Sequence, residues 1–309
     1  STLCTRGVYA DDTTRGYMAD YDRSHPGWGT TAERWWNFYA DRPWLAGAFV
    51  WTGFDYRGEP TPYSWPCISS HFGIMDVCGF PKNNYYYYQS WWSGRDVLHL
   101  APHWNWSAGD TVDVWCMSNA DNVELFLNGA SLGLKAMAKN GHLEWRVPYA
   151  AGTLEAVGTR GGKRMRTRVA TTGAPVSLAL RAERTLSVAD GEDVAVCAVT
   201  ALDADGIPVP LAADEVTFAL EGEGTILGVG NGDPSSHEPD RYLEGAWHRK
   251  LFNGAAQVIV RAGRRPGRLS VTASAAGLKP AVLTFELGKG EPRPSVAAYE
   301  PSVYLHAGR

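Results

Sequence analysis

The sequence predicts a multidomain chain in which an α/β part precedes an all-β part. The expected architecture is the C-terminal end of a (β/α)8 TIM barrel followed by two immunoglobulin-like β-sandwiches. Helical and extended apolar patterns alternate in the first third, only strand patterns follow it, and ten of the 13 Trp residues lie at or before Trp106. The expected divisions are barrel residues 1–96, sandwiches 97–172 and 173–288, and a loosely held tail, 289–309.

A helix is expected over residues 30–41. Ala32, Trp35, Trp36 and Tyr39 recur at helical spacing, and Thr30 with Glu33 has the form of a capping box. A buried strand should follow at about 45–51 because that run is apolar.

A long loop over residues 52–80 comes next, with one short strand expected around 72–75. Pro81 then stands at a favoured first helical position, before a helix at about 82–92. This order is typical of a (β/α) barrel near its end. Closing eight strands takes about 250 residues, so 1–96 should be partly disordered, packed on the sandwiches or buried by self-association.

Residues beyond 97 show the alternation of half-buried strands. Val112, Val114 and Cys116 alternate with polar or larger neighbours, and Asn128-Gly129 is a strong hairpin signal. Residues 171–175 read as a linker. Further alternating runs separated by turn signals predict the second sandwich.

Composition excludes several classes of function. A net charge of −4 and a pI near 6.1 argue against a nucleic-acid partner. Because no apolar run approaches about 18 residues, no membrane partner is expected. The five scattered cysteines fit no metal pattern, although Cys67 and Cys78 could form a disulfide in an oxidising compartment. The first residues read like the interior of a domain, so we expect a piece of a longer protein.

The segment 48–63 carries the candidate site. Its apolar run breaks at Gly53 into a loop rich in aromatics and carboxylates, and Trp51 at the break would offer a flat face to a sugar. Asp55 and Glu59 would accept hydrogen bonds from hydroxyl groups. The alternatives are that Trp51 only caps a strand and that the carboxylates are solvated or pair with Arg57.

Three blocks of this chain resemble bacterial β-galactosidases of glycoside hydrolase family 2. They lie at 49–63, at 72–92 and at 226–239, in the order that the family shows. The resemblance implies a retaining glycosidase with two catalytic Glu residues. Residues 1–7 look like the segment just after the nucleophile, so both would lie upstream of Ser1. No catalytic residue is therefore expected here, and the fragment alone should be inactive.

The resemblance also bears on the sugar. β-Glucuronidases of the family carry an Asn-Lys-Lys run where this chain has Ser70, His71 and Phe72, so a uronic acid would lack a cation and a neutral hexose is favoured. Galactose follows from overall similarity. His71 is a further candidate for contact with the substrate, and the alternative is a structural histidine bonded within the protein. A sodium-site pair of some family members corresponds to Ser69 and Phe72, so neither sodium nor any other metal or cofactor is expected.

The expected partners are a β-galactoside and the N-terminal part of the same protein, with a homo-oligomer left open. The resemblance implies a periplasmic or extracellular location. Two alternatives remain: a carbohydrate-binding or adhesin-like sandwich module, and a purely bracing role for residues 97–288. Asp233, Glu238 and Asp240 raise a calcium site, but their spacing fits no defined calcium loop and favours a structured turn.

Overall fold

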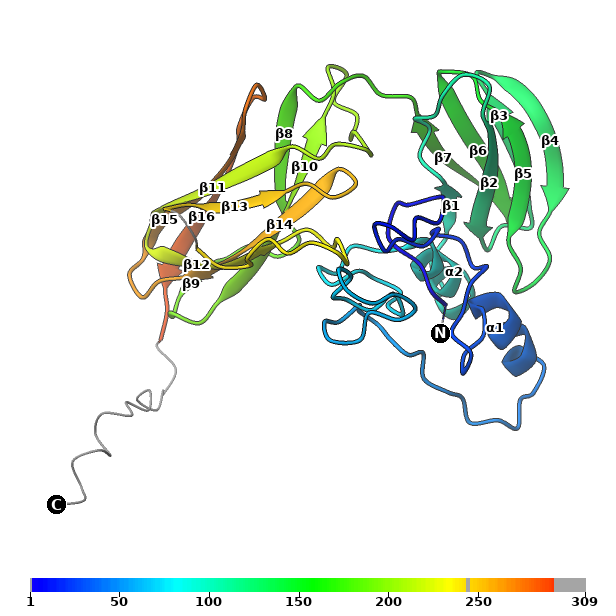
Figure 1. Ribbon diagram of the computed structural model, residues 1–309, viewed down its shortest axis with the longest axis horizontal. Helices are drawn as coiled ribbons and strands as arrows, with labels where there is room; N and C mark the ends of the chain where they lie inside the picture. The colour runs from blue at the N-terminus through cyan, green and yellow to red at the C-terminus, as the bar shows by residue number, and fades with distance from the viewer. Residues whose placement is uncertain (1, 243–244, 292–309) are drawn as a thin grey trace.

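The computed structural model describes residues 2–242 and 245–291. Two β-sandwiches stand side by side, and a segment with two helices and long loops lies against both (Figure 1). The tail expected over 289–309 falls largely outside the described residues. No helix among the described residues is long and apolar enough to cross a membrane.

The first sandwich holds seven strands in two antiparallel sheets. One sheet has the order β1-β2-β5 and the other β4-β3-β6-β7. The strands are β1 (Leu98–Ala101), β2 (Thr111–Ser118), β3 (Asn122–Leu127), β4 (Ala130–Ala136), β5 (Leu143–Pro148), β6 (Thr153–Arg160) and β7 (Lys163–Ala170).

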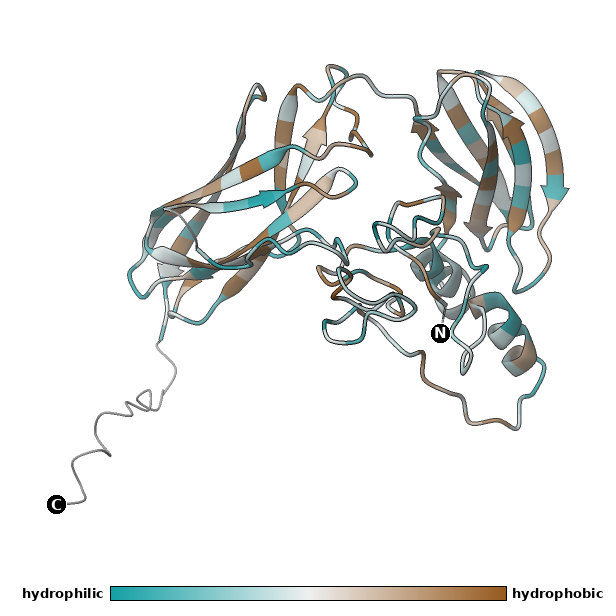
Figure 2. Ribbon diagram, viewed as in Figure 1, coloured by the Kyte–Doolittle hydropathy of each residue, from teal (hydrophilic) through white to brown (hydrophobic). Residues whose placement is uncertain are grey.

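Alternating side chains build the core of this sandwich, and Figure 2 shows the alternation along its strands. Val112 and Val114 of one sheet and Val123 and Leu125 of the other are fully buried in one cluster. The predicted hairpin is confirmed: β3 and β4 are joined at Asn128-Gly129, both with positive φ, as a tight hairpin turn requires.

The second sandwich has sheets of order β12-β14-β10-β8 and β13-β11-β15-β16-β9. Residues 171–176 carry no regular structure and connect it to the first, as the linker prediction states. Its strands are β8 (Ser177–Ala182), β9 (Val188–Ala189), β10 (Val194–Leu202), β11 (Glu215–Gly222), β12 (Gly224–Gly230), β13 (Trp247–Lys250), β14 (Ala255–Ala262), β15 (Gly267–Ala275) and β16 (Ala281–Lys289).

Both helices predicted in the first 96 residues are present, as α1 (Ala32–Ala40) and α2 (Asn83–Trp92). The predicted capping box on α1 is wrong. Thr30 and Thr31 make no side-chain capping bond, and the carboxylate of Asp22 accepts both first-turn amides instead, from Ala32 and Glu33 at 2.8 Å each. A cap from a residue ten positions upstream has no local sequence signature.

The strand predicted at 45–51 is wrong. These residues form no ladder and are largely exposed, with the side chain of Phe49 fully open to solvent. Around 72–75 only isolated bridges form, from Met75 to Phe54 and to Pro81. A strand needs a neighbour to satisfy its backbone groups, and the described chain offers none to 45–51. The described residues accordingly contain no evident portion of a TIM barrel.

The N-terminal segment packs on both sandwiches. Tyr87 and Tyr88 of α2 share a buried cluster with Trp115 and Met117 of β2, and Trp35 of α1 contacts Tyr88. Of the three states expected for 1–96, the described residues adopt the packed one.

All five cysteines are free, so the disulfide between Cys67 and Cys78 is not formed. The thiol of Cys67 instead contacts the carbonyl oxygens of Ser69 and Pro234.

Candidate functional site

Trp51 presents an aromatic face at the surface of the loop formed by residues 51–66, the candidate loop. Its side chain is 56% exposed. The indole Nε1 donates to the hydroxyl of Tyr56 at 3.1 Å, and the two rings meet edge to face. The indole therefore has its polar edge bonded to the protein while a large part of its apolar surface faces solvent.

Tyr56 links Trp51 to Glu59. Its hydroxyl donates to the carboxylate of Glu59 in a short hydrogen bond. Burial and the neighbouring Glu59 raise the pKa of Tyr56, so this hydroxyl keeps its proton. The three side chains are therefore linked by two consecutive hydrogen bonds, from indole to phenol to carboxylate. The sequence pointed to Trp51 and Glu59 but not to Tyr56.

Backbone pairing between residues 52–55 and 72–75 holds the loop. The amide of Thr52 donates to Phe72, that of Ile74 to Thr52, and that of Asp55 to Met75. Gly73 is required at this crossing, because a Cβ there would lie 2.2 Å from both the Asp55 nitrogen and the Met75 oxygen.

Asp55 faces the interior rather than the loop surface. Its carboxylate pairs with the ammonium of Lys82 at 2.7 Å, and both side chains are almost completely buried. Asp55 also accepts from the Gly73 amide at 2.8 Å, while Lys82 donates to the Cys4 carbonyl at 2.7 Å. The partner of Asp55 is therefore Lys82 and not Arg57.

Burial dominates the electrostatics of this pair. It raises the pKa of Asp55 to about 6, although Lys82 and the hydrogen bond from the Gly73 amide act in the opposite direction. Lys82 stands at the N-terminus of α2, where the helix dipole disfavours a cation. A lysine at this unfavourable position is a signal in the sequence that a carboxylate elsewhere in the chain pairs with it.

His71 is also buried, and its ring lies between two backbone carbonyl groups. Nε2 is 2.9 Å from the Gly16 oxygen and Nδ1 is 3.2 Å from the Thr61 oxygen. Burial and the nearby Lys82 lower the pKa of His71 to about 4, so the ring is neutral at pH 7. A neutral ring can donate to only one of these two carbonyl groups, so His71 makes one hydrogen bond and only contacts the other oxygen.

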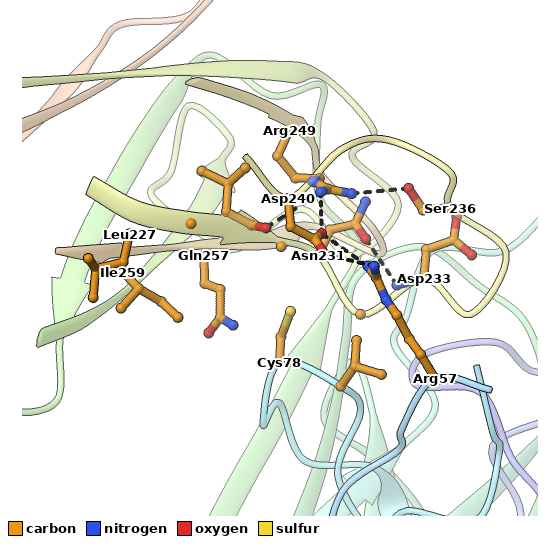
Figure 3. A pocket seen from close by; sticks show the side chains of 15 residues that line it. Arg57, Cys78, Leu227, Asn231, Asp233, Ser236, Asp240, Arg249, Gln257 and Ile259 are labelled. Atoms are coloured by element: carbon orange, nitrogen blue, oxygen red, sulfur yellow. Dashed lines mark hydrogen bonds and ion pairs between the residues drawn. The ribbon is translucent and has the colours of Figure 1, made fainter. Parts of the chain in front are cut away.

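A cavity of about 270 Å³ with a mixed polar and apolar lining lies where the candidate loop meets the second sandwich (Figure 3). Arg57 of the loop pairs with Asp240 at 2.7 Å, and the buried Arg249 of β13 pairs with the same carboxylate at 2.6 Å. The residues expected to form a structured turn do so: Asp240 binds these arginines, and Asp233 accepts from the Ser235 amide at 2.9 Å.

A larger cavity of about 550 Å³ lies between the N-terminal segment and both sandwiches. Its lining is mixed aromatic and polar and includes Tyr9, Tyr17, His103, Trp106 and Lys250. Trp51, Tyr56 and Glu59 do not line it, so the candidate loop and this cavity are separate features.

The family model described as glycoside hydrolase family 2 C-terminal domain 5 matches residues 178–284, which cover most of the second sandwich. A second model, described only as a domain of unknown function, matches residues 109–166 of the first sandwich.

The β-galactosidase BoGH2A of Bacteroides ovatus is 40% identical over an alignment 302 residues long, which covers 92% of this chain and 35% of that protein. The chain belongs to glycoside hydrolase family 2. A second relative, a putative β-glucuronidase of Formosa agariphila, is 34% identical over 79% of the chain and 24% of its own length. The chain thus spans about a third or less of these relatives.

A solved structure shows the same arrangement. A β-glycosidase from Bacteroides vulgatus superposes with a TM-score of 0.84 at 30% identity, covering 93% of this chain and 41% of that one. The relatives of this chain carry both β-galactosidase and β-glucuronidase names, so family membership by itself does not choose the sugar.

Proposed function

We propose that the chain is the C-terminal part of a retaining β-galactosidase and that Trp51 forms part of the sugar-binding wall. The observation that carries this proposal is the solvent-facing indole whose Nε1 is held by Tyr56, which is in turn held by Glu59. A fixed aromatic face binds the C–H surface of a sugar, and the second oxygen of Glu59 can accept from a hydroxyl.

The remaining site residues have positioning roles in this proposal. Both Asp55 and His71 are buried beneath the loop. Asp55 pairs with Lys82 and His71 contacts the Gly16 carbonyl, so both residues hold the loop in position. The sandwiches brace it through contacts such as Arg57 with Asp240.

The exposed apolar residues at 44–51 support the interpretation that this segment completes a barrel whose other strands lie upstream. Trp44, Leu45 and Phe49 are open to solvent, and the parallel bridge between Phe54 and Met75 has the orientation of neighbouring barrel strands. The catalytic acid/base and nucleophile would come from that upstream part, so the chain alone should not cleave glycosides.

A neutral sugar fits the charges near the loop. Lys82 is fully buried and bound to Asp55, and Arg57 is paired with Asp240, so neither cation is available to a uronate carboxylate. This supports a galactoside over a glucuronide.

The test is hydrolysis of nitrophenyl β-galactoside by the chain alone and by the whole enzyme that includes the upstream part. We expect activity in the whole enzyme only, and faster cleavage of the galactoside than of the glucuronide. Activity of the rigorously purified chain alone would contradict the upstream placement of the catalytic residues. Preference for the glucuronide would contradict the sugar assignment.

Within the whole enzyme, Trp51→Ala should lower kcat/KM for the galactoside by about ten- to a hundredfold, since it removes the aromatic face. The matched control is Trp65→Ala, which removes another exposed indole of the same loop that stacks on His237 instead. Equal losses in both variants would count against a sugar-stacking role for Trp51.

A further inference from the structure

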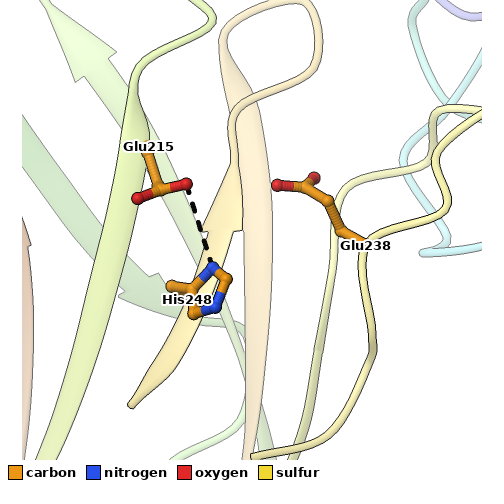
Figure 4. Close-up of side chains that lie close together, drawn as sticks. All are labelled: Glu215, Glu238 and His248. Atoms are coloured by element: carbon orange, nitrogen blue, oxygen red, sulfur yellow. Dashed lines mark ion pairs between the residues drawn. The ribbon is translucent and has the colours of Figure 1, made fainter. Parts of the chain in front are cut away.

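Three side chains with metal-binding atoms converge on one side of the second sandwich. Glu215 begins β11, His248 lies in β13, and Glu238 belongs to the loop that joins β12 to β13 (Figure 4). Because Glu215 pairs with Lys250 and Thr217 with His248, Glu215 and His248 are diagonal neighbours on the same face of the sheet. One ligand atom from each of the three residues lies within 4.8 Å of the others.

The hydrogen bonding of His248 is incomplete among the described residues. Its Nδ1 is shielded from solvent and has no hydrogen-bond partner among residues 2–242 and 245–291. The nearest Glu215 oxygen is 3.9 Å away, which is too far for a hydrogen bond. Two ligands of a tetrahedral ion, each bound at about 2.0–2.2 Å, stand about 3.3–3.6 Å apart, so the side chains would have to draw together by roughly half an ångström to bind one.

A second histidine between two glutamates shows the contrasting arrangement. In the first sandwich, His142 Nδ1 lies 2.5 Å from Glu33 and its Nε2 lies 2.8 Å from Glu144. Both ring nitrogens there are already bound to carboxylates, so that cluster is complete as an ion-pair network. The cluster around His248 has the same residue types with the centre left open.

We propose that Glu215, Glu238 and His248 bind a divalent transition-metal ion, with Zn²⁺ as the best-fitting ion. One imidazole nitrogen and two carboxylates form a donor set that Zn²⁺ accepts, whereas Ca²⁺ and Mg²⁺ prefer oxygen ligands alone. Glu215 is exposed, so water can complete the coordination. The known contacts of Glu238, from Ser236 and Arg249, both use Oε2.

Such an ion would fasten the loop after β12 to the sheet. That loop contacts the N-terminal segment, since the amide of Ile68 donates to the Pro234 carbonyl at 2.9 Å and Arg57 pairs with Asp240. Metal binding is therefore coupled to the stability of the junction rather than to a chemical step.

The experiment is titration of the tag-free, chelator-treated chain with Zn²⁺, followed by calorimetry and by thermal unfolding. We expect one Zn²⁺ per chain and a rise in Tm. His248→Gln and Glu215→Gln should each weaken binding by at least about tenfold, because each removes one ligand. Co²⁺ should give visible absorption bands of a nitrogen–oxygen site in the unaltered chain and lose them in His248→Gln.

The matched control is His237→Gln, the same substitution one residue from Glu238. His237 contacts the Pro66 carbonyl and the Trp65 ring, so Zn²⁺ binding should be unchanged. The proposal is overturned if the chain binds no Zn²⁺, if Ca²⁺ or Mg²⁺ binds as tightly, or if His237→Gln weakens binding as much as His248→Gln. Circular dichroism of each variant shows whether a loss reflects unfolding.

Discussion

At the residue scale, the ion pair between Asp55 and Lys82 is the central support of the candidate loop. Together these two side chains join three separate stretches of the chain, because Lys82 at the start of α2 also binds the Cys4 carbonyl and Asp55 also binds the Gly73 amide. A buried pair adds little net stability compared with apolar packing, but removing one partner leaves an uncompensated charge. The pair therefore fixes geometry more than it stabilises the fold.

Asp55→Asn should destabilise the N-terminal segment by about 3–5 kcal/mol at pH 7.5, because Lys82 stays buried without its counter-ion. Tryptophan fluorescence during urea denaturation reports on this segment, which holds most of the indoles. The double variant Asp55→Asn with Lys82→Met should recover part of the loss. A single-variant change within about 0.5 kcal/mol would show that the charge is solvated.

His71 makes stability depend on pH. Its folded pKa of about 4 lies below the unfolded value of about 6.5, so between these values the unfolded chain binds a proton that the folded chain does not. The free energy of unfolding should therefore fall as the pH is lowered through this window.

In His71→Gln this contribution is absent. The stability deficit of the variant relative to the parent should shrink by about 2 kcal/mol between pH 6.5 and 4.5. Urea denaturation at several pH values measures it. A constant deficit would mean that the folded imidazole titrates as it does in the unfolded chain. Asp55, whose raised pKa acts in the opposite direction, remains in both proteins and cancels in the comparison.

At the scale of elements, α1 depends on a cap that comes from outside its own sequence neighbourhood. Asp22 binds the amides of Ala32 and Glu33 and also accepts from the Thr2 hydroxyl at 2.7 Å. A carboxylate at a helix N-terminus also interacts favourably with the helix dipole. The helix then packs Trp35 and Trp36 against Trp92 of α2.

Asp22→Ala should cost about 1–2 kcal/mol by removing this cap, whereas Thr31→Ala at the N-cap position should cost less because its side chain makes no capping bond. Amide hydrogen exchange in the first turn of α1 distinguishes the two. Exchange no faster in Asp22→Ala than in Thr31→Ala would contradict the role of Asp22 as the cap.

At the scale of the whole molecule, Arg6 joins the N-terminal segment to the second sandwich. Its guanidinium pairs with the buried Asp76 at 2.6 Å and donates to the Phe252 carbonyl at 2.6 Å. Asn253 donates back to the Arg6 carbonyl at 2.7 Å. The orientation of the sandwich relative to the candidate loop rests on this junction together with the pair between Arg57 and Asp240.

Arg6→Gln should raise the rate of amide hydrogen exchange at 230–233 and 251–254. Exchange in β2 of the first sandwich should not change, because only the contact between the N-terminal segment and the second sandwich is lost. The expected destabilisation is about 3–5 kcal/mol because Asp76 stays buried. Arg15→Gln serves as control, because Arg15 pairs with Asp12 at the surface and exposed ion pairs contribute little to stability. Matching exchange patterns in the two variants would remove Arg6 from this role.

The sequence by itself determined the features that depend on near neighbours. Alternation predicted the strands around Val112 and Val123, and Asn128-Gly129 predicted the hairpin turn. Helical spacing predicted α1, and Pro81 predicted a helix close to the observed α2. It also identified Trp51 and Glu59 as a pair of candidates that the structure links through Tyr56.

Only the tertiary structure decided which groups meet across long sequence separations. It paired Asp55 with Lys82, turned His71 inward, capped α1 with Asp22, and left the apolar run at 45–51 without a strand neighbour. A local pattern records the preference of a residue for burial or for a backbone conformation. The choice of partner depends on where distant segments pack, and the local pattern carries no record of that.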